Sequence, residues 1–126
     1  MASSGPTVVD AKTNPGTFEL SSDFKPTQTA TIVADVKDFT AKVTDVNLRF
    51  LHVPMEIPMQ NIGGTTWRAQ LSSEQLKTLA VGGQTIKYDV NVVAKDEDGM
   101  TAVSKEPINI AVKAPDLSKP VQQGSG

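Results

Sequence analysis

The sequence predicts an all-β protein, a seven-strand antiparallel β-sandwich with one short helix in a crossover. Three observations predict this fold class. Apolar and polar residues alternate with a period of two in segments such as 30–36, 46–52 and 86–92, which is typical of strands with one buried and one solvated face. Turn-forming Gly, Pro, Asn and Asp residues separate these segments. Their regular spacing favours two stacked antiparallel sheets.

The expected elements follow from the alternation and the turns. Pro54 and Pro58 cannot donate ladder hydrogen bonds, so the strand that contains them is expected at a sheet edge or as an irregular extended segment. Gly99 is expected to supply the positive φ of a tight hairpin turn after Asp96. The predicted strands are 7–20 (broken at 14–16), 28–36, 43–52, 54–60, 65–71, 84–94 and 100–113, with a helix over about 72–80.

The predicted helix begins with a capping-box pattern formed by Ser72 and Gln75. Leu76 and Leu79 follow at helical spacing, and the glycine pair at 82–83 is expected to end the helix in the left-handed conformation. One or two turns are too short to be stable alone. We therefore expect the two leucines to hold the helix against the core.

The inward-facing apolar residues of the strands predict the core. On each strand they occupy every second position, on the face opposite the charged residues. The predicted core residues are Ile32, Leu48, Phe50, Trp67, Leu71, Tyr88, Val90, Val92 and Ile110.

Composition excludes several classes of function. The 126 residues carry 12 Lys and Arg against 14 Asp and Glu, a net charge of -2, which argues against a nucleic-acid partner. No apolar run approaches the length of a membrane span. The chain has no cysteine, so disulfides, thiol nucleophiles and cysteine-ligated metals are excluded.

The chain is expected to hold one folded domain over 7–113. Residues 1–6 have neither the basic cluster nor the apolar stretch of a signal peptide, and we expect them to be disordered or expression-derived. Residues 114–126 contain Pro, Gly and Ser with little pattern, which is typical of a linker or tail.

Few residues are candidates for chemistry. The only histidine, His52, ends a strand and has no nucleophile motif beside it, so a surface or strand-end role is favoured over a catalytic one. The acidic turn with Asp96 and Asp98 is the best metal candidate, for calcium, but acidic hairpin turns are ordinarily solvated and hold no ion. We therefore expect no catalytic residue and no cofactor, with calcium as the alternative.

Two apolar features have a structural and a functional interpretation. Met55, Ile57 and Met59 share one face; they either cover the rim of the core, which is favoured, or form an adaptable interaction stripe. Trp67 and Tyr88 lie on the apolar side of their strands, so a core position is favoured over a sugar-binding platform.

The segment from Asp38 to Val112 resembles bacterial immunoglobulin-like or fibronectin type III-like surface domains. The resemblance is carried by Val46-x-Leu-x-Phe50, Trp67-x-Ala-x-Leu71, Gly83-x-x-Ile-x-Tyr-x-Val-x-Val-x-Ala94 and Asp96-x-x-Gly99. It implies a tyrosine corner in which the Tyr88 hydroxyl bonds to upstream backbone. The cysteine pair of antibody domains is absent.

The resemblance implies a non-catalytic structural or interaction module of a larger secreted, periplasmic or cell-surface protein. Its partners would be neighbouring domains of the same chain or another surface protein, without nucleic acid or membrane insertion, and the isolated domain would be a monomer. The alternative is a ligand-binding accessory domain, for carbohydrate or calcium, attached to an enzyme.

Overall fold

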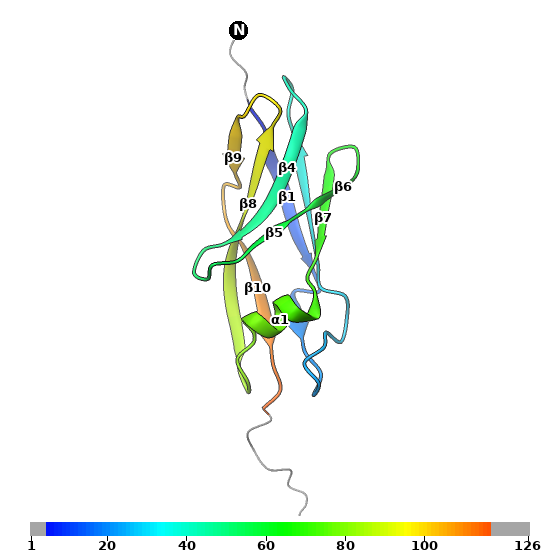
Figure 1. Cartoon of the computed structure of the whole chain (residues 1–126), viewed down its shortest axis with the longest axis vertical. Coiled ribbons are helices and arrows are strands. Elements are labelled where there is room, and N and C mark those ends of the chain that lie inside the picture. The colour runs from blue at the N-terminus through cyan, green and yellow to red at the C-terminus, as the bar shows by residue number, and fades with distance from the viewer. Residues whose placement is uncertain (1–4, 117–126) are drawn as a thin grey trace, which may run out of the picture.

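Two β-sheets pack face to face around one hydrophobic core, and the one short helix of the described residues lies near one end (Figure 1). The computed structural model describes residues 5–116. Within that range the protein is mostly β, as the sequence predicts. Of the predicted flanks 1–6 and 114–126, residues 1–4 and 117–126 lie outside the described residues.

The first sheet has four strands and is antiparallel throughout. The register of its outermost strand on one side shifts between Val8 and Asp10, which places the side chain of Val9 in solvent. In spatial order its strands are β1 (Thr7–Asn14), β3 (Thr31–Lys37), β7 (Thr66–Gln70) and β6 (Gln60–Gly63).

The second sheet is built around the long central strand β8, whose neighbours cover both of its edges. One pairing in this sheet is parallel, between β2 and β10, whereas a fully antiparallel sandwich was predicted. In spatial order the strands are β2 (Thr17–Glu19), β10 (Ile108–Lys113), β8 (Thr85–Asp96), β4 (Val43–Phe50) and β5 (Glu56–Pro58), and β9 (Thr101–Val103) also pairs with β8.

The prediction of seven strands is wrong, because the described residues form ten. Three predicted strands are each split in two, at or next to a proline. Pro15 separates β1 from β2, and Pro58 ends β5 just before β6. Both splits transfer the chain from one sheet to the other, since proline lacks the N–H that would continue the ladder.

The third split separates β9 from β10 through residues 104–107. Here a side chain replaces part of the ladder: the Val92 N–H donates to Ser104 Oγ at 3.1 Å. The Ser104 N–H in turn donates to the Val92 carbonyl at 2.9 Å. Pro107, which has no N–H, then precedes the renewed pairing of β10 with β8.

Helix α1 (Ser73–Leu79) has the predicted start. The Gln75 N–H donates to Ser72 Oγ at 3.1 Å, and the Ser72 N–H donates to Gln75 Oε1 at 2.8 Å, which together form the capping box. Leu76 and Leu79 are buried, at 0% and 1% exposure. The seven-residue helix is therefore held by its packing.

The predicted end of the helix is wrong. The chain leaves the helix at Ala80, which is extended with φ −83° and ψ 142° and whose N–H donates to the Lys77 carbonyl at 3.2 Å. Gly83 does have a positive φ of 75°. It lies in the next turn, which is closed by a hydrogen bond from the Gln84 N–H to the Val81 carbonyl at 3.0 Å.

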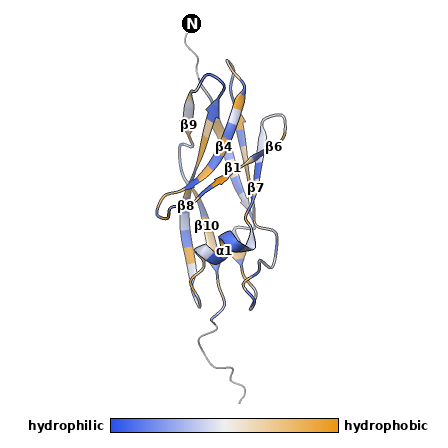
Figure 2. Ribbon diagram, viewed as in Figure 1, coloured by the Kyte–Doolittle hydropathy of each residue, from blue (hydrophilic) through white to orange (hydrophobic). Residues whose placement is uncertain are grey.

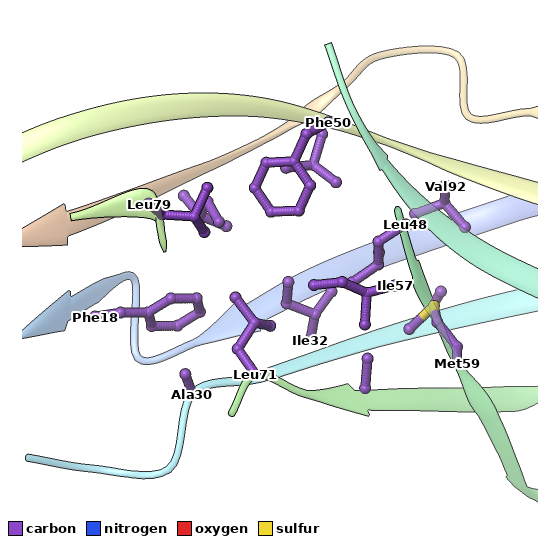
Figure 3. Close-up of a cluster of buried hydrophobic side chains, with 14 of the residues drawn as sticks. Phe18, Ala30, Ile32, Leu48, Phe50, Ile57, Met59, Leu71, Leu79 and Val92 are labelled. Carbon is purple, nitrogen blue, oxygen red and sulfur yellow. The ribbon is translucent and has the colours of Figure 1, made fainter. Parts of the chain in front are cut away.

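The core confirms the predicted alternation of apolar and polar residues. Hydrophilic and hydrophobic residues follow one another along the strands (Figure 2). Eight of the nine predicted core residues are buried, and Tyr88 is half-buried. The core also includes Phe18 and Leu79, which point into the same space as Leu48 and Leu71 (Figure 3).

Candidate functional site

A hollow of about 790 Å³ opens at one end of the sandwich. Three connections surround it: the β3–β4 loop, the β6–β7 turn and the β8–β9 turn. They lie at the end of the molecule where β1 begins (Figure 1). Residues of these connections and of β3, β4, β6 and β7 line the hollow: Val36, Asp38, Ala41, Lys42, Val43, Thr44, Asn61, Gly64, Thr65, Trp67 and Glu97.

The β3–β4 loop is shaped by the carboxylate of Asp38. Its Oδ1 atom accepts hydrogen bonds from the N–H groups of Thr40 and Ala41, each at 2.9 Å, and from the Thr40 hydroxyl at 3.1 Å. This arrangement is an Asx-type turn, in which a short acidic side chain satisfies the backbone that follows it. It fixes one wall of the hollow.

The β6–β7 turn forms the opposite wall and depends on Asn61. The Asn61 side chain accepts from the Gly63 N–H at 3.0 Å and donates to the Gly64 carbonyl at 3.1 Å. Gly63 and Gly64 have φ values of 130° and 53°, in the region that favours glycine. The hydroxyl of Thr65 donates to the Asp35 carboxylate on the neighbouring strand β3.

The β8–β9 turn is organised by Asp96, which is only 1% exposed. Its Oδ1 atom accepts from the N–H groups of Asp98 and Met100, each at 2.9 Å. Gly99 has the predicted positive φ, at 81°. Asp96 therefore caps this turn in the same way that Asp38 caps the β3–β4 loop.

These two acidic connections are also bonded to each other through the backbone. The Glu97 N–H donates to the Lys42 carbonyl at 2.9 Å. The Thr44 hydroxyl donates to the Lys95 carbonyl at 3.2 Å. The β3–β4 loop and the β8–β9 turn thus form a continuous unit at this end.

The side chains of Asp38 and Asp96 meet where the two connections join. Burial raises the pKa of Asp96, and its hydrogen bond with Asp38 raises that pKa further. Burial acts on Asp38 in the same direction, but hydrogen bonds from the Thr40 N–H, Asp96 and the Ala41 N–H outweigh it and lower the pKa of Asp38 overall. The pKa values of the two carboxyls are therefore shifted in opposite directions.

The calcium residues expected from the sequence are not brought together as a ligand set. Asp96 faces inward, whereas Asp98 is exposed and contributes its backbone N–H to Asp96. The residue that Asp96 does meet is Asp38, which is remote in the sequence. In the part of the chain that the structure describes, no group of three or more His, Cys, Asp or Glu residues could hold a metal ion.

The other candidate residues are dispersed over the fold. Ile57 and Met59 are buried in the core, and Met55 packs half-buried against it, so only Met55 of this stripe is open to a partner. His52 lies on the exposed β4–β5 connection. It is not among the residues that line the hollow.

Trp67 and Tyr88 occupy different places. Trp67, at 8% exposure, forms part of the floor of the hollow. The ring of Tyr88 meets Phe50 edge-on, with centroids 5.9 Å apart and an interplanar angle of 69°. Its hydroxyl donates to the Leu79 carbonyl, which confirms the predicted bond to upstream backbone.

Within residues 5–116, no helix is both long and apolar enough to cross a bilayer. Comparison of the chain with protein-family models, with curated proteins and with solved structures found no match.

Proposed function

We propose that this protein is a non-catalytic structural or interaction module of a larger extracytoplasmic bacterial protein, with an immunoglobulin-like or fibronectin type III-like fold. Two features support the fold assignment. If the three split strands are each counted once, the ten strands reduce to seven. The tyrosine of β8 also bonds to backbone before its own strand, as a tyrosine corner does.

The position of the first and last described residues, Gly5 and Asp116, is the observation that supports a spacer function. Gly5 lies beside Met100 in the β8–β9 turn, where an added Cβ would be 3.3 Å from the Met100 Cβ. Asp116 lies beside Gly83, just before β8 begins. The two ends are therefore separated by the length of β8, whose 12 residues span roughly 40 Å at about 3.3 Å per residue.

A rigid body of this kind would fix the distance between the segments that precede and follow it. The chain enters at one end of the long axis and leaves at the other (Figure 1). Both ends of the described chain are tied to the body: Gly5 is buried beside Met100, and Ala114 is buried with its N–H donating to the Gln84 carbonyl at 3.0 Å. A neighbour on either side would be held at a set distance, while the loops between remain available for contact.

The spacer function is tested by measuring the end-to-end distance in solution. The chain has no cysteine, so Gln84→Cys and Asp98→Cys place two dyes uniquely, one at each end. We expect one narrow energy-transfer distribution corresponding to roughly 40 Å, unchanged when folded reporter domains are fused to both termini. A broad distribution, or one that shortens in the fusion, would contradict the proposal.

A second function, ligand binding as an accessory domain, is favoured by the hollow. Its mouth carries Lys42 and Glu97, and its floor includes Trp67, a combination of polar groups and an aromatic surface that suits a small polar ligand such as a sugar. Glycan-array binding by the purified protein tests it. We expect the Lys42→Ala and Glu97→Ala variants to lose such binding, with Glu56→Ala, outside the hollow, as the control.

A further inference from the structure

The Asp38–Asp96 pair has an unusual hydrogen-bond pattern. In each residue Oδ1 accepts the N–H groups of its own turn. The Oδ2 atoms are both buried, and neither receives a hydrogen bond from an N–H or O–H group of the described residues. Each carboxyl thus has one satisfied oxygen and one buried oxygen without such a donor, and the two side chains lie within hydrogen-bonding reach of each other.

Two ionised carboxylates cannot satisfy each other, because both only accept hydrogen bonds and their charges repel. A single proton solves both problems, since one carboxyl then donates to the other and the pair carries one charge. We propose that Asp38 and Asp96 share one proton and so join the β3–β4 loop to the β8–β9 turn, as a pH-sensitive connection at the end of the sandwich that carries the hollow.

The surroundings favour a shared proton over two charges. Asp96 is 1% exposed, and of the charged groups around it Asp38 is the one that acts on its pKa. The other charged residues on the elements packed against the pair belong to the β3–β4 loop, β4, the end of β8 and the β8–β9 turn: Lys42, Asp45, Lys95, Glu97 and Asp98. Among the described residues, none of them forms an ion pair with Asp38 or Asp96.

The sign of the pH dependence follows from the two opposite pKa shifts. The raised pKa of Asp96 gives stability that is fully present below its ordinary value of 3.8 and is lost as the pH rises through the folded-state value. The lowered pKa of Asp38 gives stability that is present above 3.8 and is lost as the pH falls through its folded-state value. The pair is therefore most stabilising near pH 3.8, between the two shifted values, and weakens as the pH rises through the folded-state value of Asp96.

The Asp96→Asn variant tests the shared proton directly. An asparagine keeps an oxygen for the N–H groups of Asp98 and Met100 and presents an NH₂ group to Asp38 at every pH. We expect its melting temperature to exceed that of the unaltered protein by a few degrees at a pH above the folded-state pKa of Asp96, and the difference to shrink as the pH falls towards 3.8. Asp98→Asn changes an exposed carboxyl of the same turn, so we expect it to keep the original pH profile.

A difference in melting temperature between Asp96→Asn and the unaltered protein that does not change with pH would overturn the proposal, because it would show that Asp96 has no shifted titration in the folded state. A measurement on the unaltered protein does not depend on how the variant folds. In a carbon NMR titration of the side-chain carboxyls, we expect Asp96 to titrate above 3.8 and Asp38 below it. Titration of Asp96 at or below 3.8 would refute the shared proton.

Addition of calcium distinguishes a shared proton from a bound cation. If the two buried oxygens hold a cation, millimolar calcium will raise the melting temperature at neutral pH, and Asp96→Asn will abolish that rise. This outcome would replace the proton with a metal ion and overturn the proposal. An unchanged melting temperature supports it.

Discussion

Trp67 shows how one side chain can serve both the core and the surface. It lies on β7 with 8% of its surface exposed and also contributes to the floor of the hollow. Its sequence position predicts the first role, because it alternates with the outward-facing Arg68. The second role depends on the loops that fold over its edge.

Trp67→Ala is expected to lower the free energy of unfolding by about 3–5 kcal/mol, because it removes a large buried side chain and leaves a cavity. Urea unfolding followed by circular dichroism measures the loss. Phe39 is a matched control, since this aromatic residue is 86% exposed and its replacement by alanine should change stability by less than about 0.5 kcal/mol. A loss below about 1 kcal/mol for Trp67→Ala would place that side chain on the surface.

Tyr88 allows a spectroscopic test, because it is the only tyrosine of the chain. Burial raises its pKa above the ordinary value of 10.0, and its neutral hydroxyl donates to the Leu79 carbonyl, which a phenolate cannot do. The stability that this group contributes is present below pH 10.0 and is lost as the pH rises through the folded-state value.

We expect an ultraviolet absorbance titration of the folded protein to give a tyrosine pKa above 10.0, and the urea-unfolded protein to return it to about 10.0. Equal values in the two states would contradict the buried hydroxyl. Tyr88→Phe should leave the Leu79 carbonyl without its donor and lower the free energy of unfolding by about 1–2 kcal/mol.

At the scale of the elements, α1 combines a local signal with a tertiary one. Its capping box is present in the sequence and in the structure, where the Gln75 N–H donates to Ser72 Oγ at 3.1 Å. Its seven residues cannot hold a helix alone. The contacts of Leu76 and Leu79 with the core supply the stability that the helix lacks on its own.

Ser72→Ala is expected to lower the free energy of unfolding by about 1 kcal/mol, because it removes the N-cap acceptor. Hydrogen exchange of the α1 amides should report faster local opening. Ser73→Ala, one position further along and inside the first turn, is the matched control and should change stability by less than about 0.5 kcal/mol. Equal losses for the two variants would show that the capping box does not stabilise the helix.

The strands illustrate the limit of a periodic pattern. Alternation located the strands of both sheets, and the prolines correctly placed the 54–60 segment at an edge, since β5 and β6 are outer strands of their sheets. The pattern does not show that this segment belongs to two sheets. That division depends on which neighbour accepts each backbone N–H, as when the Met59 N–H donates to the Val46 carbonyl at 2.7 Å.

At the scale of the whole molecule, a single core connects both sheets and the helix. Its members come from elements throughout the described chain, from Phe18 on β2 to Val112 on β10. Among residues 5–116, the buried apolar side chains form this one cluster, so neither sheet has a separate core of its own. Unfolding of one sheet would therefore expose the inner face of the other.

We expect the protein to unfold in one cooperative transition. The fluorescence of Trp67, the only tryptophan, reports on the first sheet near the hollow, and far-ultraviolet circular dichroism reports on all strands. The two urea transitions should coincide in midpoint and slope. Separate midpoints would show that the end of the molecule carrying the hollow opens independently of the body.

The sequence by itself determined the all-β class, the helix start, the turn at Gly99 and most of the core. These features depend on local preferences: side chains alternate along a strand, a serine caps a helix, and glycine adopts a positive φ. Each is set by residues within a few positions of one another, so each can be recognised from the order of the residues alone.

Only the tertiary structure decided which strand joins which sheet, the parallel pairing of β2 with β10 and the meeting of Asp38 with Asp96. In the sequence, Asp96 stands beside Asp98, and nothing distinguishes Asp38 from the other acidic residues. The physical reason is that these contacts join segments remote along the chain. Packing of the two sheets brings them together, and burial then changes the charge that two ordinary carboxyls can carry.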